Sequence, residues 1–325
     1  MRKTSLYIFV LFASLVTFGQ NTNRFSQFNF VKSLYNPGAL ATDASFTADL
    51  IYRNQWAGVD GAPSTFGFNS AYELTDEMAV GINFYNDQIG LTKTASFSAS
   101  YAYRVIFDNR KYLAFGLGLG TDNVNLGLAS ATTTEANDPA FSQSLSRFNF
   151  NGSFGIYYRT PTFYAGASIP QLFQNSLVGT ETDFRPDRWH YIAVSGYFWE
   201  VSDRLVLNPS IQLKATKYAP LQGDIIVRAI TRIVGFSAGY RSEKTVIAGI
   251  DFTLADRIRI GYAFNADLGP LAKTKGFSHE VYLGIGLPYY FNSETFGSNK
   301  YVGRKGSSKV NYRRSYTRSN RKFRF

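Results

Sequence analysis

The sequence contains no cysteine, only two methionines and two histidines, and no long apolar run beyond its first twenty residues. Without cysteine, neither a disulfide framework nor a lipid-modified cysteine anchor can form. His190 and His279 are far apart in the sequence and form no recognisable metal-ligand set, and the acidic residues do not have calcium-loop spacing. A membrane-spanning helix needs about 20 apolar residues in a row. We therefore expect no metal, no other cofactor and no helical membrane span.

The first residues have the pattern of a secretory signal. Arg2 and Lys3 precede an apolar run from Leu6 to Val16, and small residues follow. The apolar core is shorter than the roughly 20 residues that a membrane anchor requires. We expect residues 1–19 to be a signal peptide that is cleaved between Gly19 and Gln20.

The charge of the chain is concentrated at its end. The formal net charge is +11, but residues 292–325 hold ten Lys and Arg against a single Glu, which leaves the body close to neutral. A basic segment without an apolar stripe is predicted to be disordered until it binds a partner. Behind a signal peptide, we expect an acidic periplasmic partner and no nucleic acid, contacted through Arg304, Lys305, Arg313, Arg314, Arg318, Arg321, Lys322 and Arg324.

The body of the chain alternates apolar and polar residues. In residues 147–159, Phe148, Phe150 and Phe154 fall on one face, and Asn149 and Asn151 fall on the other. This period of two indicates β-strands, and it recurs through residues 204–216, 245–254 and 257–267. A soluble β-sandwich has the same alternation, so the pattern alone does not choose between a sandwich and a membrane barrel.

Composition and turn lengths favour the barrel. Aromatic residues make up 17 % of the chain, although the mean hydropathy is −0.16. Short links are expected near residues 74–77, 108–110, 160–161, 201–204, 229–232 and 255–257; the links between them, mostly longer, are Ala57–Pro63, Asn86–Lys93, Leu126–Ser146, Gln171–Asp187, Lys217–Gln222, Arg241–Lys244 and Asp267–Gly276. Tight periplasmic turns that alternate with long external loops are typical of outer-membrane barrels. We predict an all-β transmembrane barrel of about 14 antiparallel strands over residues 45–291.

The segment before the first strand is different. Residues 20–44 show no clean period of two. We predict that they form a plug-like segment in the lumen or cover one mouth of the barrel. The chain is then divided into a signal peptide (1–19), the plug-like segment (20–44), the barrel (45–291) and a basic periplasmic tail (292–325).

Two glycine-rich motifs resemble catalytic or phosphate-binding signatures. "GFSAG" at residues 235–239 fits the nucleophile elbow, which requires a strand, a sharp turn and a helix, but Ser237 lies inside an alternating strand. Asp251 and His279 follow in the permitted order, and nothing in the sequence places them beside Ser237. "GLGLG" at residues 116–120 lacks the phosphate-loop spacing, so we interpret its glycines as inward-facing strand residues. We expect no enzymatic activity.

The N-terminal third resembles a known family. Over "SLYNPGALATDASFTADLIYRNQWAGVDGAPSTFGFNSAYEL" it is similar to the PorP/SprF outer-membrane proteins of the Bacteroidetes. The residues that carry the resemblance are Asn36, Pro37, Tyr52, Arg53, Gln55, Trp56, Gly58, Asp60, Gly61, Ala62 and Pro63. "NPGALAT" departs from the family's usual form, and the resemblance does not extend to the basic tail.

This resemblance implies an accessory of type IX secretion and gliding motility. Such a barrel helps to export or anchor a large secreted surface protein, often an adhesin, and has links to periplasmic machinery. We expect the two longest external loops, Leu126–Ser146 and Gln171–Asp187, to contact that cargo. The alternative is a passive or apolar-solute outer-membrane channel.

The side-chain direction of Trp56 stays open. If Tyr52 faces lipid, strand parity places Arg53 and Gln55 toward the lumen. Trp56 then anchors the chain at the outer membrane interface or packs in the lumen against Asn36 and Pro37. Gly58, Gly61 and Pro63 are the residue types that a turn requires.

Overall fold

The computed structural model describes residues 25–42, 44–108, 111–130, 144–175, 182–183, 186–217, 219–255, 257–269 and 276–287. The predicted signal peptide and the predicted basic tail with its eight named cations lie outside the described residues.

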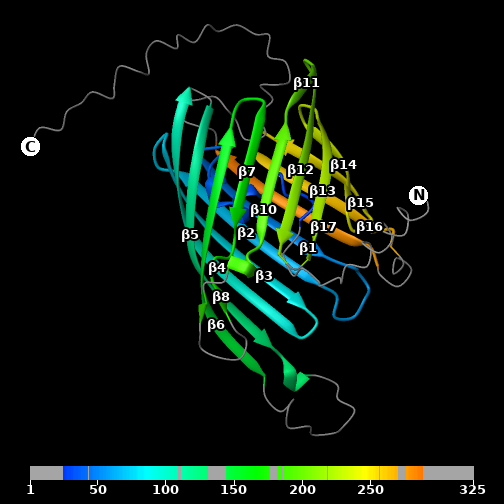
Figure 1. Cartoon of the computed structure of the whole chain (residues 1–325). Helices are drawn as coiled ribbons and strands as arrows, with labels where there is room; N and C mark the ends of the chain where they lie inside the picture. Colours follow the sequence, from blue (N-terminus) through cyan, green and yellow to red (C-terminus); the bar gives the residue numbers. More distant parts are fainter. Residues whose placement is uncertain are drawn as a thin grey trace, which may run out of the picture.

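The chain forms a closed antiparallel β-barrel of 14 strands, as predicted (Figure 1). Each strand pairs with its neighbours in the wall, β1 pairs with β17, and β10 pairs with β12 to complete the ring. Closure gives each strand of the wall a hydrogen-bonded neighbour on both sides, which a membrane requires. The wall consists of β1 (Phe46–Asn54), β2 (Ser64–Glu73), β3 (Met78–Ile89), β4 (Thr92–Asp108), β5 (Lys111–Leu126), β6 (Leu145–Arg159), β7 (Phe163–Ile169), β10 (Tyr191–Tyr197), β12 (Leu205–Thr216), β13 (Ala219–Ile230), β14 (Val234–Arg241), β15 (Thr245–Leu254), β16 (Ile258–Asp267) and β17 (Ser278–Leu287).

A few short elements accompany these strands. The strand β11 (Trp199–Ser202) follows β10 in the same sheet and pairs with β12, whereas β8 (Gln174–Asn175) and β9 (Thr182–Asp183) form a separate two-stranded sheet. The described helices are α2 (Lys32–Tyr35), η1 (Pro37–Ala39), η2 (Leu128–Ser130) and η4 (Pro186–Arg188). None of the helices in the described ranges is long and apolar enough to cross a membrane.

The two faces of the wall differ as the alternation predicts. In β1, Tyr52 points outward and is 46 % exposed, whereas Arg53 points inward and is 5 % exposed. Phe148 and Phe150 of β6 are likewise outward and exposed. The outward face is therefore rich in large apolar side chains, and the inward face carries most of the buried polar and charged ones.

The turn pattern is confirmed in outline and wrong in two places. The links at residues 74–77 and 255–257 are short, and the connections 127–144 and 170–190 are the longest. The long links predicted at Asn86–Lys93 and Lys217–Gln222 do not exist, because β3 ends at Ile89 and β4 begins at Thr92, and because β12 ends at Thr216 and β13 begins at Ala219. Gly90, between β3 and β4, has a φ of +56°, a left-handed conformation that favours glycine and permits the tight turn there.

The hydrophobic core lies inside the barrel. Phe25, Phe28, Val31 and Tyr35 of the N-terminal segment are buried there, and inward side chains of the wall pack against them: Ile51, Ile192, Ile226, Ile247 and Tyr282. The prediction of a lumen segment is therefore confirmed for the described residues 25–42, which we call the lumen plug.

Candidate functional site

The start of the lumen plug is fixed by a buried carboxylate. Glu280 of β17 is fully buried, and its oxygens accept hydrogen bonds from the Ser26 backbone N–H at 2.8 Å and from the Gln27 N–H at 3.2 Å. The Arg53 guanidinium donates to the same carboxylate at 2.6 Å. A buried carboxylate needs such partners, because desolvation of a lone charge is costly. Glu280 thus ties the wall to the plug.

A second ion pair supports the same turn of the plug. Arg241 of β14 contacts Asp224 of β13 at 2.9 Å and donates to the Ser26 hydroxyl oxygen at 3.2 Å. The Ser26 hydroxyl in turn donates to Asn265 of β16 at 2.7 Å. One small plug residue is therefore held by side chains from three different strands.

Phe30 lies between two cations. The Arg228 and Arg259 guanidinium carbons are 4.9 Å and 4.7 Å from its ring centre, and Tyr282 packs beside it at 4.9 Å. Arg228 also pairs with Asp251 at 2.5 Å. Cations favour the face of an aromatic ring, so this cluster holds the middle of the plug against β13–β17.

Asn36 and Pro37 rest on the opposite wall. The Asn36 side chain accepts from the Gly38 N–H at 2.8 Å and donates to the Ile156 carbonyl of β6 at 3.0 Å. A Cβ atom at Gly155 would overlap the Asn36 amide, and one at Gly116 would overlap the Pro37 backbone. Glycine is therefore needed at these two wall positions, which confirms that the "GLGLG" glycines face inward.

The end of the plug is held by Arg104 of β4. This guanidinium donates to the carbonyl oxygens of Leu40 at 2.9 Å and Ala41 at 2.7 Å, and it contacts Glu73 of β2 at 2.8 Å. Residues 25–42 are thus anchored at both ends and in the middle.

Burial also affects the protonation state of Tyr35 in the plug. The Tyr35 hydroxyl oxygen accepts a hydrogen bond from the Phe25 N–H at 2.9 Å. Burial raises the pKa of Tyr35 well above its ordinary value, so the hydroxyl stays protonated and neutral at physiological pH.

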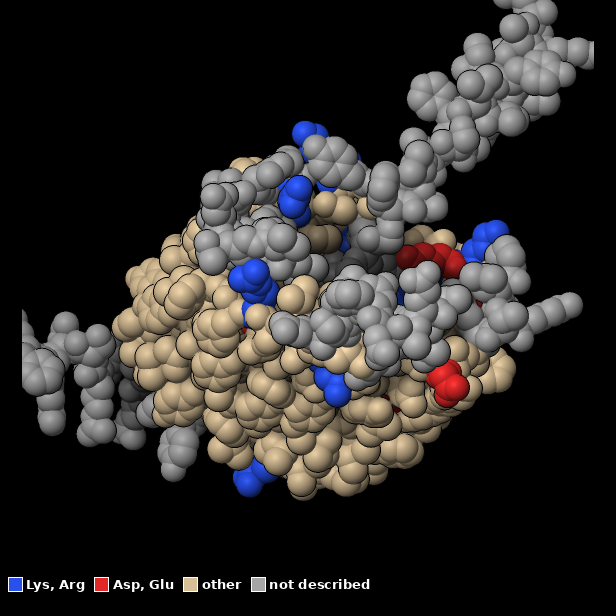
Figure 2. Space-filling model, turned by 90° about the horizontal axis from the view of Figure 1, so that it is seen from below, with Lys and Arg blue, Asp and Glu red and all other residues tan. Residues whose placement is uncertain are grey.

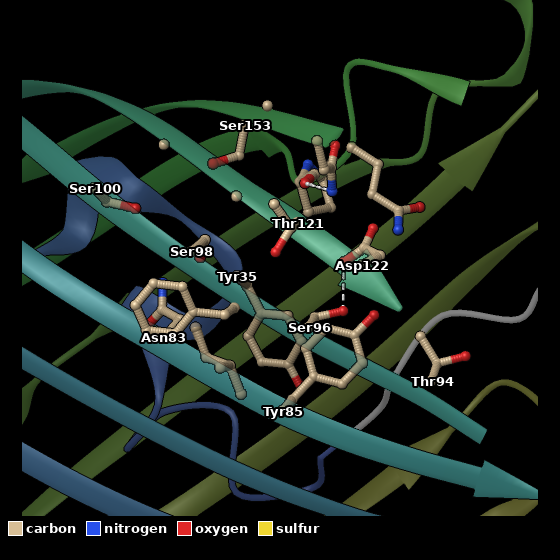
Figure 3. A pocket seen from close by; sticks show the side chains of 18 of the residues that line it. Tyr35, Asn83, Tyr85, Thr94, Ser96, Ser98, Ser100, Thr121, Asp122 and Ser153 are labelled. Atoms are coloured by element: carbon tan, nitrogen blue, oxygen red, sulfur yellow. Dashed lines mark hydrogen bonds between the residues drawn. The ribbon is translucent and has the colours of Figure 1, made fainter. Parts of the chain in front are cut away.

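A cavity of about 390 Å³ lies in the lumen beside the plug, and both polar and apolar side chains line it, Leu34, Phe173 and Ile192 among the apolar ones (Figure 3). Its floor is formed by plug residues such as Ser33, Tyr35 and Pro37. Its walls are the inward faces of β3–β6, which supply mainly hydroxyls, amides and glycines: Asn83, Tyr85, Asp87, Thr92, Thr94, Ser96, Ser98, Ser100, Gly118, Gly120, Asp122, Asn149, Asn151 and Ser153.

The cavity contains two carboxylates and a neutral histidine. Asp87 accepts a hydrogen bond from Thr65 at 2.5 Å, and Asp122 accepts one from Ser96. His190 precedes β10, and burial, together with the nearby Lys214 cation, lowers its pKa. Among the described residues that line the cavity, none is Lys or Arg.

The cavity belongs to the long-loop end of the barrel. Asp87 and Asp122 lie near the ends of β3 and β5 that lead into residues 90–91 and 127–144. Figure 2 looks onto this end, where the described basic side chains appear as separated points on a mostly uncharged surface. By the general rule for such barrels, this is the external end.

Trp56 lies at the start of the first external loop and is half-buried. Its backbone has a φ of 52°, which turns the chain after β1, and its indole N–H donates to Asp267 at the end of β16 at 2.9 Å. The Trp56 N–H also donates to the Ser278 hydroxyl at 3.2 Å. Trp56 therefore ties the first external loop to the β16–β17 connection.

The other family residues are dispersed over four places. Asn36 and Pro37 lie in the plug, Arg53 lies in the lumen beside Glu280, and Tyr52 faces outward. Gln55, Gly58, Asp60, Gly61 and Pro63 belong to the first external loop, where the Gln55 N–H donates to the Pro63 carbonyl at 2.9 Å. The structure does not bring these residues together in one site.

The Asp251 and His279 side chains have partners other than Ser237. Ser237 lies inside β14, Asp251 pairs with Arg228, and His279 lies 2.7 Å from the Tyr262 hydroxyl. Ser237 is followed by more strand and not by the helix that a nucleophile elbow requires.

Sequence reasoning missed the strongest anchors of the plug. Glu280 and Arg104 were not singled out, although each is a charge at an inward position of an alternating strand. Such a charge needs a partner in the lumen, and this signal could have identified both residues.

Comparison with protein families gives a match to the type IX secretion system membrane protein PorP/SprF over residues 17–285. The chain belongs to the PorP/SprF family. It is therefore a type IX secretion membrane protein, and its barrel places it in the outer membrane. None of the curated proteins matches.

Several solved barrels are similar in fold to this PorP/SprF chain. The Ralstonia pickettii toluene transporter TbuX has a TM-score of 0.48 at 10 % identity, covering 78 % of this chain and 92 % of that one. The CymD monoaromatic hydrocarbon channel has a TM-score of 0.47 at 11 % identity and 84 % and 96 % coverage. Omp33 of Acinetobacter baumannii has a TM-score of 0.46 at 5 % identity, with 76 % and 100 % coverage. At these values the similarity concerns barrel architecture, and no transport activity follows from it.

Proposed function

We propose that this barrel is a non-enzymatic docking accessory of type IX secretion. It helps to export a large secreted surface protein, such as an adhesin, or holds that protein at the cell surface. The observation that carries the proposal is the anchored plug. Glu280, Asn36 and Arg104 attach residues 25–42 to separate parts of the wall, and an occupied lumen suits a docking barrel better than an open pore.

The external loops are the proposed contact surface for the cargo. The connections at residues 127–144 and 170–190 are the longest in the chain and lie at the same end of the barrel. Loops carried on a rigid scaffold are where binding residues concentrate.

The test is to replace residues 127–144 and 171–187 with short Gly-Ser turns and to measure how much cargo stays at the cell surface. We expect retention to fall while the amount of folded barrel is unchanged. A matched control replaces the short turn at residues 242–244, which should leave retention intact. Normal retention with both loops shortened would contradict this contact surface.

The tail at residues 292–325 is the proposed link to acidic periplasmic components. Replacing its eight named cations with glutamine keeps the length of the chain and removes eight of the ten positive charges of the tail. We expect co-purification of periplasmic secretion components to be lost, because the attraction is electrostatic. Unchanged co-purification would remove the tail from the proposal.

The alternative, a passive or apolar-solute channel, makes an opposite prediction about flux. A channel conducts ions or takes up solute in liposomes without a protein partner. The plug and the hydroxyl-rich wall of β3–β6 argue against an apolar path. A third alternative, enzymatic activity at Ser237, predicts that Ser237→Ala abolishes the surface phenotype, and we expect no change.

A further inference from the structure

The lumen is divided into two chemically different halves. The wall formed by β13–β17 and β1 carries ion pairs, such as Arg53 with Glu280 and Arg241 with Asp224, that hold the plug. The wall formed by β3–β6 carries mainly hydroxyls, amides and glycines around the cavity, together with the carboxylates of Asp87 and Asp122 (Figure 3). Only the first half is needed to explain how residues 25–31 are fixed.

Some polar atoms in the second half have no partner. Ser100 is 7 % exposed, and its hydroxyl makes no hydrogen bond to any described residue. The side-chain oxygens of Asn83 and Asn151 are also buried and accept no hydrogen bond from any described residue. Buried polar atoms normally have partners, because leaving one unsatisfied costs about 1–3 kcal/mol. All three residues line the cavity.

The remaining lining residues define the chemistry of that ligand. Tyr85 and Tyr35 supply aromatic rings, and Ser96, Ser98 and Thr94 supply hydroxyls that both donate and accept. Asp87 and Asp122 would repel an anion, and His190 adds no positive charge because its pKa is lowered. A volume of about 390 Å³ falls within the usual range of small-molecule sites.

We propose that this cavity binds a neutral saccharide of one or two residues, entering from the external end. A sugar presents many hydroxyls to the Asn, Asp, Ser and Thr side chains, and an apolar ring face to the tyrosines. This inference is independent of the docking role proposed above. Neither the proposed cargo contact nor the proposed role of the basic tail requires this cavity.

The test is calorimetric titration of the full-length barrel in detergent with neutral disaccharides. We expect cellobiose or N,N′-diacetylchitobiose to bind saturably with a Kd of about 1 mM or tighter. Digalacturonate, an anionic disaccharide, should bind at least tenfold more weakly, because Asp87 and Asp122 would repel its negative charges. The proposal would be overturned if neither neutral sugar bound saturably. It would also be overturned if a lysine-rich peptide bound more tightly than both sugars.

The variants Asn83→Ala and Ser100→Ala separate a ligand role from a structural one. Each removes a polar atom that makes no described hydrogen bond, so the unliganded Tm should stay the same or rise. The affinity for the sugar should nevertheless fall at least threefold. Asp60→Asn, which removes an exposed carboxylate from the first external loop, is the matched control and should leave the affinity unchanged. Unchanged affinity in both cavity variants would contradict the site.

Discussion

At the scale of single residues, Glu280 has the largest consequences. It is fully buried, pairs with Arg53, and accepts hydrogen bonds from two backbone N–H groups of the plug. A buried charge with partners of this kind is held by all of them together, so removing it affects both the wall and the plug.

Glu280→Gln should therefore lower the free energy of unfolding by about 3 kcal/mol or more, because Arg53 loses its carboxylate in a buried place. Chemical unfolding of the barrel in detergent measures this. Glu200→Gln, at an exposed position in β11, is the control and should change stability by less than about 0.5 kcal/mol. Equal effects of the two substitutions would contradict the role of Glu280.

Gly116 offers a second test at this scale. Gly116→Ala places a methyl group against the Pro37 backbone and should destabilise the barrel by about 1–3 kcal/mol through overpacking. Gly127→Ala is the control, since its nearest contact would be the Leu91 carbonyl oxygen at 3.4 Å. Thermal unfolding of both variants compares them, and an unchanged Tm for Gly116→Ala would show that the plug does not rest there.

The residue scale also shows what could be predicted from the sequence. The inward direction of Arg53 followed from parity in β1, because alternation is a local property. The Trp56–Asp267 hydrogen bond could not be predicted, because the left-handed backbone at Trp56 breaks the parity and Asp267 is distant in sequence. The partnership of Arg53 and Glu280 depends on the pairing of β1 with β17, which only barrel closure specifies.

At the scale of elements, the plug and the strands were predictable to different degrees. Alternation identified the strands, and the absence of alternation identified the plug. The short links after Ile89 and after Thr216 were predicted as longer loops, because polar residues near the strand ends resemble loop residues. In the structure, Asp87 of β3 is an inward lumen residue and not part of a loop.

The position of the plug can be tested by cross-linking, since the chain has no native cysteine. Ser33 and Asn69 side chains are joined by a hydrogen bond of 2.8 Å, so a Ser33→Cys, Asn69→Cys double variant should form an internal disulfide in the folded barrel. Electrophoresis without reductant detects the bridge as a mobility shift.

The matched control is Ser33→Cys with Phe68→Cys. Phe68 is the neighbour of Asn69 on the same strand, and successive side chains of a strand point to opposite faces. This pair should not form a bridge. Equal bridging in both pairs would mean that residues 25–42 do not occupy the described place in the lumen.

At the scale of the whole molecule, the chain is an outer-membrane barrel of the PorP/SprF family whose lumen contains its own N-terminal segment. Family membership assigns the chain to the type IX secretion system. The filled lumen favours a docking role over transport. The central claim is therefore that the plug closes the barrel.

Ion flux through the barrel in liposomes tests this claim most directly. The account predicts that the full-length protein gives no flux above that of empty liposomes, whereas a variant lacking residues 25–42, verified to be folded, conducts. Steady ion flux through the intact protein, at the level of the plug-deleted variant, would contradict the account and favour a channel.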